Sequence, residues 1–138
     1  MLNPNSIFPS AMSLKEKKVN ANAFGNFAED TAAQSYIKQG YVILERKWRM
    51  GKIEIDLIAR KEDVVVFIEV KARKSGEREA LQAVDKDKRK RMIRAADSYL
   101  QRIEGNVSYR FDIVTCVGDQ NSYKLEIYKD AFLAADLF

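Results

Sequence analysis

The sequence GKIEIDLIARKEDVVVFIEVKAR, residues 51–73, predicts two β-strands, 52–60 and 64–73, joined by a short charged turn. A connection this short is typical of an antiparallel hairpin. The second strand is apolar on both faces, which is typical of a central strand. A buried strand should carry no charge unless the charge is paired or binds a metal, yet this strand ends in Glu69, Lys71 and Arg73. The end of the hairpin is therefore where we look for function.

Alternation along the strands predicts which side chains share a face. On the first strand, Glu54 and Asp56 are expected on one face. The apolar residues of that strand are expected on the other face: Ile53, Ile55 and Leu57. Because an acidic residue on an alternating strand is most often exposed, we interpret Glu54 as solvent-facing and keep Asp56 as the candidate site residue.

The length of 138 residues is that of one domain with its own hydrophobic core. We expect residues 1–22 to form a flexible polar tail and residues 23–138 to form the domain. No apolar run approaches the roughly 20 residues of a membrane-spanning helix, and residues 1–20 lack the continuous apolar core of a secretory signal. The single cysteine, Cys116, cannot form an internal disulfide, which favours a cytoplasmic location.

The complete absence of histidine limits the chemistry. It excludes Ser-His-Asp hydrolases, nucleases with a histidine base and nearly all zinc enzymes. No glycine-rich phosphate loop is present either. Any reaction therefore depends on carboxylates, lysine, a metal or a bound cofactor. The net charge of +4 gives mild support for a polyanionic partner.

Outside the hairpin, helical and strand-like patterns alternate in a definite order. They are a helix at 23–39, a strand at 41–48, a helix at 80–103, and strands at 110–117 and 123–128. Together with the hairpin, this order predicts an α/β fold whose central sheet is flanked by helices.

The predicted helices add further charged candidates. Glu29 lies beside the apolar stripe of the first helix, either as a site residue or because a carboxylate near a helix start suits the helix dipole. Lys88 falls on the core-facing stripe of the second helix, four residues from Val84 and from Met92. The basic run around it, which includes Arg91, is either a solvated helix face or a surface that contacts DNA phosphates.

If the two hairpin strands are neighbours, Asp56 and Glu69 converge on one small volume. Two carboxylates, a backbone carbonyl and waters suit Mg²⁺ or Mn²⁺. Lys71, two residues beyond Glu69 on the same face, could orient or help to deprotonate an attacking water and stabilise negative charge. Such a site hydrolyses phosphodiesters without histidine. An E-x-K triplet alone also occurs often by chance, so the conjunction of these features carries the argument.

This conjunction resembles the PD-(D/E)xK phosphodiesterase superfamily, because Asp56 is followed by twelve residues and then by Glu69-Val70-Lys71. More closely, the chain is similar to the YraN family of uncharacterised, Holliday-junction-resolvase-like bacterial proteins. The matching segments are Ala28-Glu29-Asp30, Gly40-Tyr41, Glu54-Ile55-Asp56-Leu57-Ile58-Ala59, Phe67-Ile68-Glu69-Val70-Lys71-Ala72-Arg73, Ala83-Val84, Lys88 with Arg91, Ala95-Ala96, Tyr99-Leu100 and Arg110-Phe111-Asp112.

The resemblance implies a restriction-endonuclease-like αβββαβ core with a mixed central sheet flanked by helices. It implies a Mg²⁺ or Mn²⁺ site at Asp56 and Glu69, with Lys71 as the catalytic lysine and Glu29 as an additional acidic catalytic residue. The implied activity is that of a DNA endonuclease, acting on branched or junction DNA, and a two-fold dimer is expected.

Under this hypothesis Arg73, Lys88 and Arg91 neutralise DNA phosphates. Two alternatives stay open. The first is a module with a nuclease fold that binds nucleic acid without cutting it. The second is a protein-interaction domain whose charges lie at ordinary surface sites.

Overall fold

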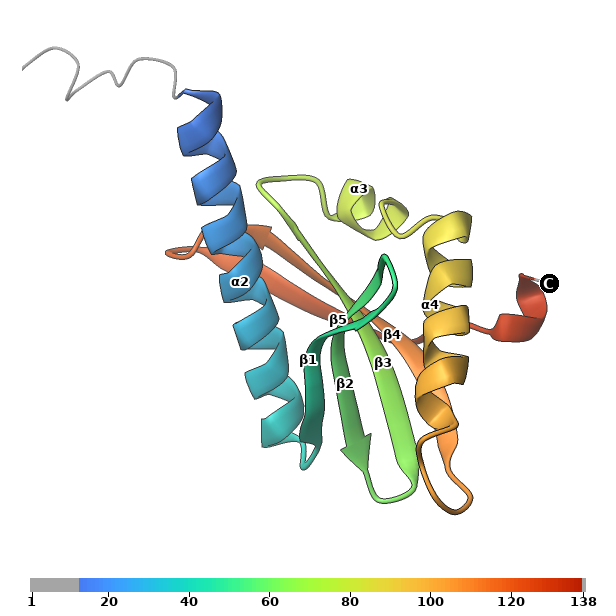
Figure 1. The fold of residues 1–138 in the computed structure, drawn as a ribbon. Helices are drawn as coiled ribbons and strands as arrows, with labels where there is room; N and C mark the ends of the chain where they lie inside the picture. The colour runs from blue at the N-terminus through green and yellow to red at the C-terminus, as the bar shows by residue number, and fades with distance from the viewer. Residues whose placement is uncertain (1–12, 138) are drawn as a thin grey trace, which may run out of the picture.

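The structure is a computed structural model that describes residues 13–137, without the side chains of Lys18 and Asn20. Its elements, in chain order, are α2 (Leu14–Lys38), β1 (Val42–Met50), β2 (Ile53–Lys61), β3 (Val64–Arg73), α3 (Glu77–Gln82), α4 (Lys86–Leu100), β4 (Ser108–Gly118), β5 (Tyr123–Phe132) and a short 3₁₀ helix, η1 (Ala134–Asp136) (Figure 1). The five strands form one sheet in the order β1-β2-β3-β4-β5. Neighbouring strands are antiparallel except β3 and β4, which are parallel. This is the mixed α/β sheet of the restriction-endonuclease-like fold, as predicted.

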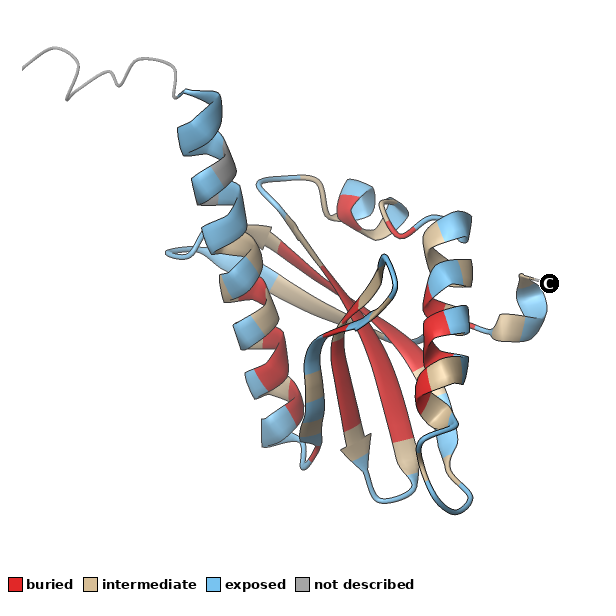
Figure 2. Ribbon diagram, viewed as in Figure 1, coloured by how far each residue is buried: buried red, intermediate tan, exposed pale blue. Residues whose placement is uncertain are grey.

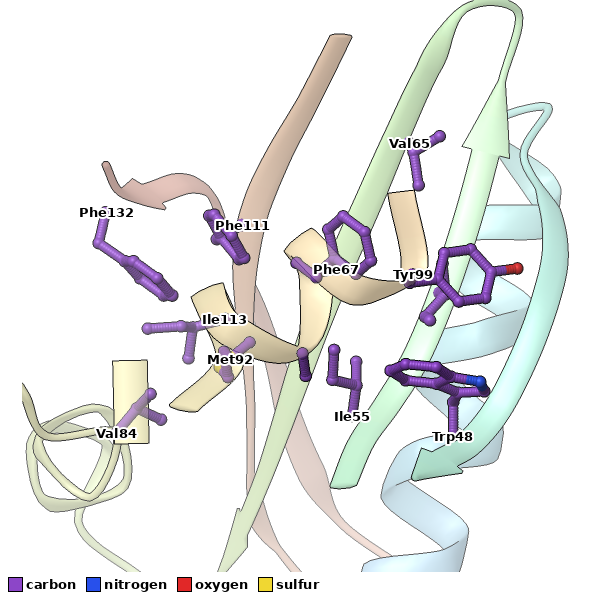
Figure 3. Close-up of a cluster of buried hydrophobic side chains, with 13 residues drawn as sticks. Trp48, Ile55, Val65, Phe67, Val84, Met92, Tyr99, Phe111, Ile113 and Phe132 are labelled. Carbon is purple, nitrogen blue, oxygen red and sulfur yellow. The ribbon is translucent and has the colours of Figure 1, made fainter. Parts of the chain in front are cut away.

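Helices cover both faces of the sheet, so the core has two halves. α2 packs on one face through Ala28, Ala32 and Tyr36, and α4 packs on the other (Figure 1). The residues of the α4 half include Trp48, Ile55, Phe67, Met92, Tyr99, Phe111 and Ile113 (Figure 3). β3 is buried on both faces, as its sequence predicts, and it lies in the centre of the buried part of the sheet (Figure 2).

α2 begins at Leu14, so its predicted start at residue 23 is wrong. Ser13 caps the helix: its hydroxyl accepts a hydrogen bond from the Glu16 backbone N–H, and the Glu16 carboxylate accepts one from the Ser13 backbone N–H. This capping box starts the helix within the segment expected to be a flexible tail. The first turns extend past the sheet (Figure 1) and leave Leu14 and Val19 exposed. Residues 1–12 of the predicted tail lie outside the described residues.

The single helix predicted at 80–103 is also wrong, because the chain forms α3 and α4 with a break between them. Asp85 caps α4, and its carboxylate accepts a hydrogen bond from the Lys88 backbone N–H at 2.9 Å. Since an aspartate in this role satisfies N–H groups at a helix start, the chain begins a new helix there. Among residues 13–137, no helix is both long enough and apolar enough to cross a membrane.

The alternation predicted for β2 fails at Asp56. Ile55 belongs to the core half under α4 and Leu57 to the half under α2, so the two do not share a face. The pairing of β2 with β3 begins only at Leu57, opposite Ile68. Asp56 marks the point where β2 separates from β3, and this separation opens the sheet next to the charged residues.

A buried polar network joins α2 to the far strands of the sheet. The fully buried Asp112 carboxylate accepts hydrogen bonds from the Tyr36 hydroxyl at 2.6 Å and from the Arg110 guanidinium at 2.9 Å. It also accepts one from the Asp130 backbone N–H at 2.9 Å. Arg110 in turn donates to the Tyr41 hydroxyl at 2.9 Å. The buried charge of Asp112 is thus fully compensated, as burial requires.

Candidate active site

A pocket of about 560 Å³ opens at the point where β2 separates from β3. It is bounded by α2 on one side and by α4 on the other. Its charged lining residues are Glu29, Lys47, Glu54, Asp56, Glu69, Lys71 and Lys88. A second pocket of about 310 Å³ adjoins it and shares Glu29, Lys47 and Asp56. Residues that are far apart in the sequence therefore form one charged cleft.

The separation of the strands is what places Asp56 in this cleft. Its carboxylate Oδ2 accepts a hydrogen bond from the Val70 backbone N–H at 2.8 Å. The side chain therefore takes the place of a backbone acceptor just beyond the last paired residues of the β2–β3 ladder. Because a charge-assisted hydrogen bond of this kind is short and directional, the carboxylate is held firmly at the opening between the strands.

Glu69 follows on β3, and its side chain is only 4% exposed. Burial, and then the negative charge of Asp56, raise the pKa of Glu69 to about 8, although Lys88 and Lys71 act in the opposite direction. The Lys88 Nζ lies 3.1 Å from the Glu69 Oε2. Even so, that oxygen accepts no aligned hydrogen bond from the described part of the chain. Ionisation of the buried Glu69 carboxyl is thus disfavoured, and its contact with Lys88 lacks an aligned hydrogen bond.

Glu29 brings a third carboxylate from α2. Burial, and then the charge of Asp56, raise the pKa of Glu29 to about 7. Lys47 on β1 opposes this rise, with its Nζ 3.5 Å from the Glu29 Oε2. Asp56 therefore interacts with an acidic group on each side of it. Carboxylates crowded in this way require a shared proton or a bound cation.

These residues fit a divalent ion that is held partly by the protein. Among residues 13–137, no three acidic, histidine or cysteine side chains converge closely enough to hold a metal by themselves. Mg²⁺ commonly uses one or two carboxylates and keeps several waters, with substrate phosphate oxygens completing its shell. Asp56 and Glu69 supply such a pair, and the Glu69 oxygen without an aligned donor is a suitable ligand.

The other predicted site residues divide into two groups. Lys71 and Lys88 line the pocket, and Lys88 points to the sheet side of α4, as its position in the helix predicts. Arg73 and Arg91 are exposed and do not line it. Glu54, which the sequence predicts to face solvent, is half-buried on the wall of the pocket, where its carboxylate lies 3.8 Å from the Arg49 guanidinium.

Lys47 was not anticipated from the sequence. Its backbone φ of +51° is unusual for a residue with a side chain, and it lies between Arg46 and Trp48, which pair with the β2 residues flanking Asp56. Its Nζ donates a hydrogen bond to the Asn26 side-chain oxygen at 2.9 Å. A lysine in an ordinary charged strand carries no signal of such a conformation, so only the structure reveals its role.

Comparison with known proteins places this chain in a family. Residues 28–116 match the model of the uncharacterised protein family UPF0102. A UPF0102 protein of Bacteroides thetaiotaomicron is 38% identical over 112 residues, which cover 80% of this chain and 93% of the relative. One from Chloroherpeton thalassium is 38% identical over 125 residues, covering 87% and 97%. One from Flavobacterium psychrophilum is 36% identical over 112 residues, covering 80% and 94%.

The matched region spans all of the pocket's charged residues, from Glu29 to Lys88. The description of the family names no activity. The matches confirm the family resemblance seen in the sequence, and the chain belongs to the uncharacterised protein family UPF0102.

Proposed function

We propose that this protein is a metal-dependent nuclease that hydrolyses phosphodiester bonds of DNA in the pocket between α2 and α4. The observation that carries the proposal is the buried Glu69 carboxylate beside Asp56, at the place where the sheet opens. Keeping two acidic groups together in a partly buried site is unfavourable. A cation bound between the two carboxylates would offset this cost, because it attracts both negative charges.

Asp56 and Glu69 would hold Mg²⁺ or Mn²⁺. A divalent ion bound there supplies polarisation of a phosphate oxygen and a water of lowered pKa. In the proposal, Asp56 is the fixed ligand, because its hydrogen bond to the Val70 N–H holds its orientation. Glu69 supplies the second, deeper carboxylate.

Lys71 and Glu29 support the reaction from opposite walls. Lys71 lies on the same face of β3 as Glu69, where its ammonium can orient a water and stabilise negative charge on the phosphate. Glu29 has a pKa near neutrality, which suits a group that accepts a proton at physiological pH. Both residues line the same pocket.

The basic residues of α4 and the end of β3 would contact the DNA backbone. Arg91 and Arg73 are exposed and available to phosphates, and such contacts give salt-dependent affinity with little sequence preference. We propose branched or junction DNA as the substrate. Cutting two strands of a junction symmetrically requires two copies of the site, so a two-fold dimer is part of this proposal.

One observation favours the alternative of a module that binds DNA without cutting it. Lys88 lies against Glu69 and offsets its charge with no metal required. A pocket neutralised in this way repels a phosphate less than bare carboxylates would. Cleavage and binding measurements on the same variants separate the two functions.

The test is cleavage of labelled junction, flap, single-stranded and duplex DNA with Mg²⁺ or Mn²⁺. We expect wild-type protein to cut at least one substrate, and Asp56→Asn and Lys71→Met to abolish cutting while both variants remain folded. Asp63→Asn, in the exposed turn of the same hairpin, is the matched control and should cut normally. Salt-sensitive binding without any cleavage would favour the binding module, and undiminished cleavage by Asp56→Asn would refute this site.

A further inference from the structure

We propose that Lys88 is the resident counter-cation of the pocket, and that a divalent ion entering between Asp56 and Glu69 displaces the Lys88 ammonium from Glu69. The inference rests on the proposed function, because it concerns the same two carboxylates. It adds a role for Lys88, whose ammonium competes with the metal ion for the Glu69 carboxylate.

The contact between Lys88 and Glu69 is close but poorly directed. The two charged atoms are 3.1 Å apart, and the side chains are 23% and 4% exposed. Yet the Glu69 Oε2 is fully buried and accepts no aligned hydrogen bond from the described residues. An ion pair that is needed for folding is normally completed by aligned hydrogen bonds. This one offsets charge without saturating the carboxylate, as expected of a partner that can be exchanged.

The other cations of the cleft are placed differently. Lys47 pairs with Glu29 and with the Asn26 amide oxygen. Lys71 lowers the pKa of Glu69 less than Lys88 does. The Glu69 charge is therefore offset chiefly by Lys88, and a metal ion must compete with that ammonium in particular.

The Lys88 ammonium can also move while the backbone of Lys88 stays in place. Its backbone N–H is held by the Asp85 cap at 2.9 Å, which fixes the start of α4. The four-carbon stem of lysine is flexible, so the ammonium can move by several ångströms. Because Lys88 lines the pocket, the displaced ammonium stays in the cleft, where an incoming phosphate would meet it.

The test is a calorimetric titration with Mn²⁺, under nitrogen at pH 8.5, of wild type, Lys88→Gln and Lys86→Gln. Burial and the Asp56 charge raise the pKa of Glu69 to about 8, so fewer protons compete with the metal at pH 8.5 than at neutral pH. Lys86 is the matched control, a lysine on the same helix that is exposed and does not line the pocket. Because Lys88 also lowers the pKa of Glu69, the measured Kd is corrected for the protons released on binding. The corrected Mn²⁺ Kd should fall about tenfold in Lys88→Gln, the effect of removing a nearby positive charge, whereas Lys86→Gln should leave it unchanged.

The outcomes separate the inference from the proposed function. If Glu69→Gln weakens Mn²⁺ binding but Lys88→Gln binds no more tightly than Lys86→Gln, the displacement is refuted and the metal site stands. If no protein binds Mn²⁺ in a way that depends on Glu69, both proposals are refuted.

A second measurement uses wild-type protein alone, so it does not depend on a variant that might fail to fold. The ¹⁵N signal of the Lys88 ammonium in wild-type protein should shift when Mg²⁺ is added at pH 8.5, while the Lys86 signal should not. An unchanged Lys88 signal at a Mg²⁺ concentration that saturates the Glu69-dependent site would overturn the proposal.

Discussion

Replacing Glu69 with glutamine should make the metal-free protein more stable while removing its ability to bind a divalent ion. Glutamine has nearly the shape of a protonated glutamate and carries no charge. The substitution therefore removes the unfavourable interaction with Asp56 and the cost of burying a charge, and it leaves the packing of β3 intact.

The magnitude follows from the pKa. Burial and the Asp56 charge raise the pKa of Glu69 from 4.5 to about 8 in the folded protein. The folded state then binds this proton more tightly than the unfolded state, so the contribution of Glu69 to stability falls as pH rises between these two values. Each pKa unit is worth about 1.4 kcal/mol, which sets an upper bound on the order of 5 kcal/mol. Because solvent and the Lys88 side chain relax around the charge, we expect a gain of about 2–3 kcal/mol at pH 8.5.

Urea unfolding with EDTA at pH 8.5 and at pH 4 measures this difference. Glu69→Gln should be more stable than wild type at pH 8.5 and nearly equal to it at pH 4. The matched control is Glu54→Gln, a half-buried glutamate of the same pocket, which should change stability by less than about 0.5 kcal/mol. A Glu69→Gln protein that is less stable at pH 8.5 would refute the reasoning, because the ion pair with Lys88 would then outweigh burial.

Three further predictions concern the pocket and its supports. Mg²⁺ should raise the melting temperature at pH 8.5 and not at pH 5, because Glu29 and Glu69 are protonated below their raised pKa values; equal shifts at both pH values would contradict this. Asp112→Asn should lower the free energy of unfolding in urea by about 3 kcal/mol, because it leaves the buried network incomplete. Tyr36→Phe should lower it by about 1 kcal/mol, and equal losses for the two variants would refute the central place of Asp112. Asp85→Ala should cost about 1 kcal/mol through loss of the α4 cap, and an unchanged urea midpoint would show that the cap adds nothing.

Much of the fold was predictable because the hairpin pattern is strong. An apolar run on both faces identifies a buried central strand, and β3 is buried from Val65 to Val70. The same pattern makes the charge of Glu69 conspicuous. Lys88 was recognisable because its spacing from Val84 and Met92 places it on the buried side of its helix, and both of these residues are buried.

The failures arise where a side chain replaces a backbone hydrogen bond. Asp56 accepts the Val70 N–H, and the strict alternation assumed for β2 breaks there. Asp85 and Ser13 each start a helix by capping its first N–H groups, at positions that hydrophobic periodicity does not detect. Ser13 with Glu16 is a recognisable capping signal. The helical turns that follow it bury little apolar surface, so the hydrophobic periodicity does not indicate a helix there.

The acidic residues of the site could be predicted from the sequence, but the ion pairs that offset their charges could not. The motif indicates Asp56, Glu69 and Lys71. It does not show that Lys47 offsets Glu29, or that Lys88 offsets Glu69, because both contacts depend on how the helices sit on the sheet. Tertiary geometry decides which cation meets which carboxylate.

The most direct test of the account is anomalous X-ray diffraction from crystals of the full chain soaked in Mn²⁺ at pH 8.5. The account predicts a peak within bonding distance of carboxylate oxygens of both Asp56 and Glu69, with the Lys88 ammonium moved away from Glu69. An absence of any peak at these two residues under saturating Mn²⁺, with Lys88 still paired to Glu69, would contradict it.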